Sequence, residues 1–175
     1  EIDPSLIDNI EVVKGAATVR FGPDALGGVI LVNPAKAKLS TPLQGKVRFH
    51  GSTNGRAGEG TVELRKGFRW WSLQGGGSYV KQGDLKAADY QLTNTGKEES
   101  SYYGELRIHP TAKLDVEVSY SNFKQELGIL SGLVFGNLDD LRQALAVDTP
   151  LYTLPFSYDI NQPRQAVSHD LIKGS

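Results

Sequence analysis

The chain has 175 residues, enough for one domain or for part of a larger protein, and its 19 basic and 20 acidic residues leave a net charge of −1. This balance gives no support for nucleic-acid binding. The sequence has no Cys and no run of about 18 apolar residues, which excludes disulfide bonds, thiolate metal sites and a transmembrane helix.

The first clear pattern runs from residue 10 to residue 33. It predicts an apolar strand, a tight turn at Gly15, a short coil or helix, the pair Gly27-Gly28 and a second apolar strand. This order resembles the last third of the plug domain of TonB-dependent outer-membrane receptors. In that family Ile-Glu-Val, a basic residue and Gly precede an aromatic-Gly pair and then Gly-Gly-Val-Ile. The resemblance implies that residues 1–38 are the C-terminal part of an α+β plug domain.

The resemblance also implies a charged lock between the plug and a barrel wall. Lys14 stands where the family usually carries Arg, and Lys lacks the bidentate fork of Arg, so either the lock is weaker here or Arg20 shares the role. Ordinary solvated charges are the simpler alternative. The glycine spacing fits neither a phosphate loop nor a dinucleotide loop, so the glycines are expected to allow tight turns. The residues of the predicted motif and lock are Glu11, Lys14, Gly15, Arg20, Gly22, Gly27 and Gly28.

From Leu43 onward, apolar and polar residues alternate with period 2, which predicts antiparallel strands. The expected strands cover residues 43–52, 60–65, 71–79, 102–109 and 114–121, and a sixth begins near residue 166. One face of the sheet collects charges and is too polar for a sandwich core, whereas it suits the lumen of a large barrel around a polar plug. The predicted lumen-facing charges include Lys46, Arg48, Glu63, Arg65, Glu105 and Arg107.

The connections between these strands differ in length. Residues 66–69 and 109–113 form tight turns and 53–58 a modest loop, whereas 82–100 and 124–165 form long excursions. Transmembrane barrels have this arrangement, with short periplasmic turns, long extracellular loops and strands of about 9–11 residues. We therefore predict a mainly β chain. Residues 39–175 are expected to supply the first five or six strands of a partial transmembrane antiparallel β-barrel, with a long extracellular loop at about 124–165.

Aromatic residues near the strand ends resemble the girdles of membrane proteins at the bilayer interfaces. Sugar or base stacking is the alternative role for the tryptophans. The predicted girdle consists of Trp70, Trp71, Tyr102 and Tyr120.

The longest excursion contains one predicted helix. Asn137 is expected to cap it, Asp139 and Asp140 lie in its first turn, and Pro150 and Pro155 follow it.

No cofactor, metal site or enzymatic activity is expected from the sequence. His50, His109 and His169 are scattered without metal-ligand spacing, and no serine occupies a nucleophile elbow.

The resemblance implies energy-dependent uptake of a scarce ligand across the bacterial outer membrane. An iron chelate, a cobalamin-like cofactor, a metal, an oligosaccharide or a peptide all remain open. The implied partners are the TonB–ExbB–ExbD complex, an extracellular small ligand and outer-membrane lipid. The chain begins inside a plug-like pattern and ends inside a strand pattern, so we expect it to be an internal part of a longer protein.

Two alternatives differ in class. One is a soluble β-sheet carbohydrate-binding or adhesion module, in which the uncharged faces pack against each other. The other is a passive porin, against which the plug motif argues.

Overall fold

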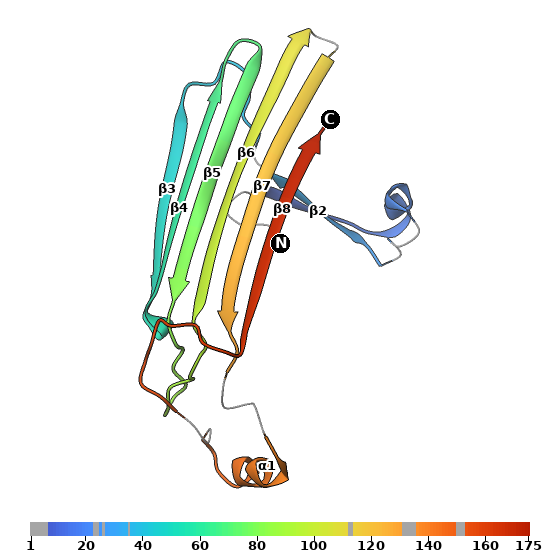
Figure 1. Ribbon diagram of the computed structural model, residues 1–175. Helices are drawn as coiled ribbons and strands as arrows, with labels where there is room; N and C mark the ends of the chain where they lie inside the picture. Colours follow the sequence, from blue (N-terminus) through green and yellow to red (C-terminus); the bar gives the residue numbers. More distant parts are fainter. Residues whose placement is uncertain are drawn as a thin grey trace.

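The computed structural model describes residues 7–22, 25, 27–34, 36–111, 114–130, 136–149 and 153–175. These residues form two antiparallel sheets, one of two strands near the N-terminus and one of six strands (Figure 1). The chain is mainly β, as predicted. Within the described ranges, no helix is long and apolar enough to cross a membrane.

The small sheet pairs β1 (Ile7–Val13) with β2 (Val29–Pro34) and projects to one side of the large sheet (Figure 1). Between its strands lies the 3-10 helix η2 (Gly15–Phe21). The turn at Gly15 has φ 72°, in the region that glycine adopts without Cβ strain. The predicted strand–turn–strand order is confirmed. An α+β domain around it stays a prediction.

The large sheet is a meander in which each strand pairs with the next along the chain, so that β3 and β8 form its edges. Among the described residues the large sheet has six strands, the higher of the two numbers predicted. Their bounds are β3 (Gln44–Ser52), β4 (Ala57–Gly67), β5 (Trp71–Gln82), β6 (Lys97–Thr111), β7 (Leu114–Gly128) and β8 (Arg164–Gly174).

The connections differ from the prediction at their ends. The first loop is only a turn at residues 53–56, and the long connections shrink to 83–96 and 129–163 because β6, β7 and β8 extend into them. The added strand segments lack apolar alternation. Cross-strand charge pairs replace it there, since Lys81 lies 3.6 Å from Glu98 and Arg164 pairs with Glu126.

The predicted helix is present as α1 (Leu138–Leu145) in the last long connection. The Oδ1 atom of Asn137 accepts hydrogen bonds from the amides of Asp139 and Asp140, both at 2.9 Å, so the predicted cap is confirmed. The helix ends before Pro150, which lies outside the described residues.

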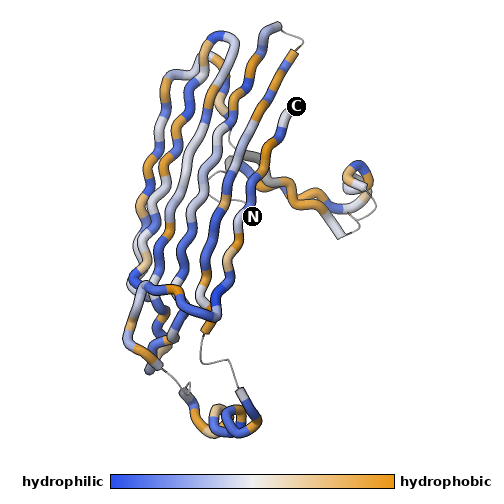
Figure 2. The backbone as a smooth tube through the Cα atoms, in the orientation of Figure 1, coloured by the Kyte–Doolittle hydropathy of each residue, from blue (hydrophilic) through white to orange (hydrophobic). Residues whose placement is uncertain are grey.

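The two faces of the large sheet are inverted relative to a water-soluble sheet. Over the strand segments predicted from the sequence, apolar and polar residues mostly alternate (Figure 2), and the pairing register gathers each kind on one side. On the apolar face Phe49 is 85% exposed and Val118 49%, whereas on the polar face Thr61 is 3% and Gln74 5% exposed. Most of the large apolar side chains in the described sheet therefore face outward, with no second layer over them.

Candidate functional site

At the long-connection end of the sheet, two loops distant in sequence are joined through a buried carboxylate. Asp84 accepts hydrogen bonds from the amides of Thr95 (2.8 Å) and Ser157 (3.2 Å), and its own amide donates to the Ser157 carbonyl (2.9 Å). The residue is only 2% exposed. Hydrogen bonds from backbone amides satisfy this buried carboxylate without a cation. Asp84 therefore connects the two loops.

Asn94 also connects the same two loops through hydrogen bonds. Its Nδ2 atom lies within 3.0 Å of the carbonyls of Ile129, Asn161 and Pro163, and its Oδ1 atom accepts from the Asn161 amide at 2.8 Å. Its φ of 60° lies in the left-handed region, which Asn tolerates better than most residues. Asn94 is 3% exposed and therefore uses its amide group almost fully inside the protein.

The turn between β3 and β4 also binds the first of these loops, at Lys86. Asn54 accepts from the Lys86 amide (2.7 Å) and donates to the Lys86 carbonyl (3.1 Å). Gly55 has φ 74°, and a Cβ there would lie 2.7 Å from the Gln82 side chain. Only glycine fits at this position, which fixes the turn against the next loop.

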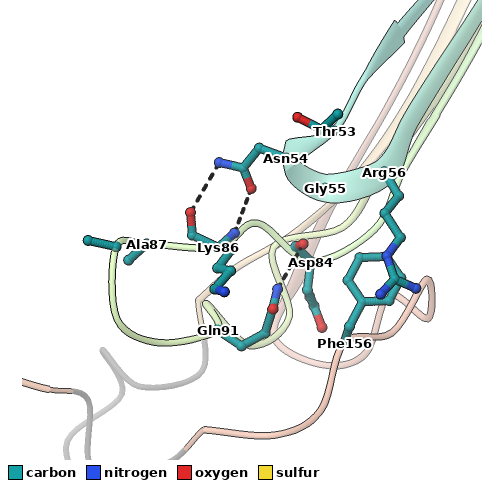
Figure 3. A pocket seen from close by; sticks show the side chains of 10 residues that line it. Thr53, Asn54, Gly55, Arg56, Asp84, Lys86, Ala87, Gln91 and Phe156 are labelled. Atoms are coloured by element: carbon teal, nitrogen blue, oxygen red, sulfur yellow. Dashed lines mark hydrogen bonds between the residues drawn. The ribbon is translucent and has the colours of Figure 1, made fainter.

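A pocket of about 480 Å³, open to solvent, lies between the turn and the two loops (Figure 3). On one side the Arg56 guanidinium lies 4.2 Å from the centre of the Phe156 ring, and on the other lie Lys86 and Gln91. Since Asp84 is engaged by amides, the charged groups available to a ligand are the two cations. We call this cavity the loop-end pocket.

Sequence reasoning missed the loop-end pocket. It identified residues 82–100 only as a polar loop and assigned no role to Asp84 or Asn94. The available signal was the local density of Asp, Asn and Thr, residue types that bind backbone groups in turns. The partners Asn161 of Asn94 and Ser157 of Asp84 lie more than sixty residues away in the other loop, and no local pattern carries such pairings.

The polar face holds the predicted charges on one side of the sheet. Arg48 pairs with Glu63 across β3 and β4, and Arg107 pairs with Glu117 across β6 and β7. Other predicted members share this face by register, since Lys46 lies opposite Glu63, Arg65 opposite Gln74, and Glu105 opposite Ser119. The structure therefore brings together the charges predicted to face a lumen.

The segment between the two sheets crosses the polar face near the short turns. Lys36 lies 3.2 Å from Glu117, and the backbone of Ser40 donates to Phe68 (2.9 Å). A Cβ on Gly67 would lie 1.9 Å from the Lys38 carbonyl, so this crossing needs glycine. Sequence reasoning assigned no role to Lys36, because its partner lies eighty-one residues later.

The predicted plug residues cluster in the small sheet and its turns. Glu11 is on β1, Lys14 precedes η2, and the Arg20 guanidinium lies 4.7 Å from the Phe21 ring centre. Among the described residues, no hydrogen bond or ion pair joins these three charges to the large sheet. The glycines of the motif lie at its turns: Gly15, Gly22 and Gly28 have positive φ, and Gly27 directly precedes Gly28.

The predicted girdle residues form two aromatic groups. Near the short turn Phe68 stacks on Trp71 with 3.9 Å between ring centres, and Trp70 lies 6.4 Å from Trp71. Toward the other end the rings of Tyr102 and Tyr120 are 5.9 Å apart. The tyrosines lie well inside long strands rather than at the strand ends where they were predicted, because β6 and β7 continue past them.

These tyrosines nevertheless mark the border of the apolar face. The last large apolar residue before the long connections is Tyr79 on β5, Tyr102 on β6, Tyr120 on β7 and Ile172 on β8. By register, the border moves two residues toward the short turns from β5 to β6, moves two more to β7, and is level at β8. With about 3.3 Å per residue and about 4.8 Å between strands, this border slants by roughly 40° over β5 to β8. From β3 to β5 the border is level, because Phe49 and Tyr79 both lie in register with Gly60.

Among the described residues, no group of three or more His, Asp or Glu side chains is placed to hold a metal ion.

No curated protein and no solved structure is a significant match to the chain. Residues 1–29 match the family model for the TonB-dependent receptor plug domain. The matched segment includes β1 and η2 and ends at the first residue of β2, so it covers most of the motif predicted from the sequence. The N-terminal segment of this chain is therefore similar to the plug domain of TonB-dependent receptors.

Proposed function

We propose that the chain is part of a TonB-dependent receptor in the bacterial outer membrane that takes up a scarce ligand. In this proposal residues 1–38 belong to the plug, and 39–175 supply the first six strands of a transmembrane barrel. The match of residues 1–29 to the plug model supports the first part. The second part rests on the large sheet.

The observation that carries the proposal is the inverted sheet with its slanted border. Exposure of this apolar face to water would carry a large unfavourable free energy, whereas lipid tails would solvate the face. Over β5 to β8, the slant of roughly 40° agrees with the ~35–45° tilt of strands in outer-membrane barrels. From Trp71 to Tyr79 the strand spans about 26 Å at ~3.3 Å per residue. At a tilt of ~40° this length covers about 20 Å of the ~25 Å apolar band of such barrels.

The polar face and the loop-end pocket take the remaining roles. The polar face would line the lumen around the plug, and the ion pair between Lys36 and Glu117 would tether the plug segment to the wall. The loop-end pocket lies at the end of the long connections, where the family binds its ligands. An iron chelate, a cobalamin-like cofactor, a metal, an oligosaccharide or a peptide all stay open as ligand.

Energy would come from the TonB–ExbB–ExbD complex acting on the plug from the periplasmic side. Glu11, Lys14 and Arg20 would then belong to the contact that holds the plug to the wall and releases it in part. Their exposed positions leave them available for wall strands beyond the six described here.

The alternative of a soluble carbohydrate-binding or adhesion module requires the uncharged faces to pack against each other. The exposure of Phe49, Val62 and Leu64 argues against this packing.

The proposal is tested with the full-length protein in plain buffer and in detergent. We expect aggregation in buffer, and a monodisperse β-rich species in detergent that inserts into phosphatidylcholine vesicles, by size-exclusion chromatography, circular dichroism and vesicle flotation. Uptake of labelled ferric chelates and cobalamin by cells with and without TonB tests the transport step. A monomer that unfolds cooperatively in plain buffer would contradict the membrane assignment.

A further inference from the structure

A second cavity of about 550 Å³ opens on the apolar face at its border toward the long connections. It follows β4 between two aromatic side chains, Phe49 on β3 and Tyr79 on β5, which lie in register on either side of Gly60. Both rings are accessible, with Phe49 85% and Tyr79 46% exposed. We call this cavity the rim groove.

The floor of the rim groove lacks side chains. A Cβ built on Gly58 would meet no atom within 4 Å, and one on Gly60 would only touch the Phe49 ring at 3.5 Å. The next position on the same face of β4 is Val62, which is 46% exposed. The groove is therefore continuous with the apolar face. Its sides are side chains of β3 and β5, and β4 runs between them.

Cations stand at the other end of the rim groove. Arg56 and Lys81 both line it, and Tyr158 fixes this end by donating from its hydroxyl to the Arg56 carbonyl (3.0 Å). Lys81 has only a loose pairing with Glu98 at 3.6 Å, with both side chains nearly half exposed. Glu59 also lines the cavity, but it lies opposite His50 and Val80, at positions that belong to the polar face.

An apolar trough with cations at one end fits a molecule that is apolar along its length and anionic at its tip. We propose that the rim groove binds an anionic, phosphate-bearing membrane lipid, with one acyl chain over Gly58 and Gly60 and the phosphate at Arg56 and Lys81. Near a membrane surface each Lys or Arg favours anionic lipid by about 1 kcal/mol. A free anion would leave the apolar floor and the two rings without a matching partner.

The inference rests on the proposed membrane location, so the experiment separates the two. Full-length protein is first inserted into vesicles of phosphatidylcholine alone, which tests only the location. It is then extracted into micelles containing phosphatidylglycerol and phosphatidylcholine, and the retained lipid is identified by native mass spectrometry. We expect the wild-type protein to retain phosphatidylglycerol preferentially.

Two kinds of variant test the two ends of the groove. A Cβ at Gly58 or at Gly104 would meet no atom within 4 Å. Gly58→Trp should therefore fill the floor and abolish the retention, whereas Gly104→Trp adds the same side chain elsewhere on the apolar face and should leave it unchanged. Arg56→Gln and Lys81→Gln should each lower the preference for phosphatidylglycerol about fivefold. Arg56→Lys should restore most of the preference.

The outcomes are distinct. Insertion without any lipid preference, or equal retention by the wild-type protein and Gly58→Trp, overturns the inference alone. Displacement of the lipid by millimolar inorganic phosphate would identify a simple anion site and also overturn it. Failure to insert into any vesicle overturns the proposed function together with the inference.

Discussion

The two faces of the six-stranded sheet come from the same strands but differ in which side chains are exposed. On the apolar face, side chains such as Val118 stand open, and several positions are glycines with free space above them. On the polar face, several polar side chains of the middle strands, such as Thr61, Ser72 and Gln74, are almost fully buried, and charged side chains pair across strands. Burial in this sheet therefore does not follow hydropathy, which is expected if lipid covers the apolar face in the proposed membrane location.

The largest effect should come from placing a charge on the apolar face. Val118→Arg is expected to lower the free energy of unfolding in vesicles by about 2–4 kcal/mol, since a cation near the bilayer centre loses its hydration. Its neighbour Ser119 points to the polar face opposite Glu105, so Ser119→Arg should cost less than about 1 kcal/mol. Urea titration of the full-length protein in phosphatidylcholine vesicles, followed by tryptophan fluorescence, measures both. Equal costs would remove the distinction between the faces.

A second pair of variants compares the space on the two faces. A Cβ on Gly76, on the polar face, would lie 2.5 Å from the Val62 carbonyl, whereas one on Gly104 would meet nothing within 4 Å. Gly76→Ala should therefore destabilise the protein by about 1–3 kcal/mol through overpacking. Gly104→Ala should be neutral or stabilise it by up to about 1 kcal/mol, because glycine is entropically costly in a strand. The same titration tests this, and a reversed order of the two variants would contradict it.

The third prediction concerns the ion pairs of the polar face near the short turns. Glu117 contacts both Arg107 and Lys36, and the Arg107 side chain is 15% exposed. Glu117→Gln leaves this guanidinium with the more distant carboxylates of Asp115, at 3.8 Å, and Glu105, and should cost about 1–2 kcal/mol. Lys36→Ala removes an exposed partner and should cost less, but it should increase hydrogen exchange in residues 36–41, measured by mass spectrometry. Unchanged exchange there would argue against a tether between the small sheet and the wall.

The alternation of the strands could be predicted from the sequence because it depends on neighbours two residues apart. Period 2 in residues 43–52 and 102–109 was sufficient to assign Arg48 and Arg107 to one face, and the register agrees. The capped helix at Asn137 is equally local. The strand ends were wrong where charge pairs such as Lys81 and Glu98 replace apolar alternation.

The loop end could not be predicted for the opposite reason. Asn94 and Asp84 act through backbone groups of residues 129–163, which only the folded meander brings near. Lys36 reaches Glu117 in the same way. The sequence at these positions shows polar residues in loops, and the identity of their partners depends on the tertiary arrangement. The plug resemblance was recognisable because its glycines and strands lie within one short segment.

The smallest expected effect belongs to an ion pair at the open edge of the polar face. Arg48 on β3 pairs with Glu63, and its side chain is 42% exposed, so Arg48→Ala should cost only about 0–1 kcal/mol. The cost should shrink further at high salt, since an exposed pair is screened by ions. If further strands cover this edge in the full-length protein, Arg48 becomes less exposed, and the cost should approach that of Glu117→Gln and persist in salt. Urea titration of Arg48→Ala in vesicles at low and at high salt therefore measures whether β3 is an edge or an interior strand of the assembled wall.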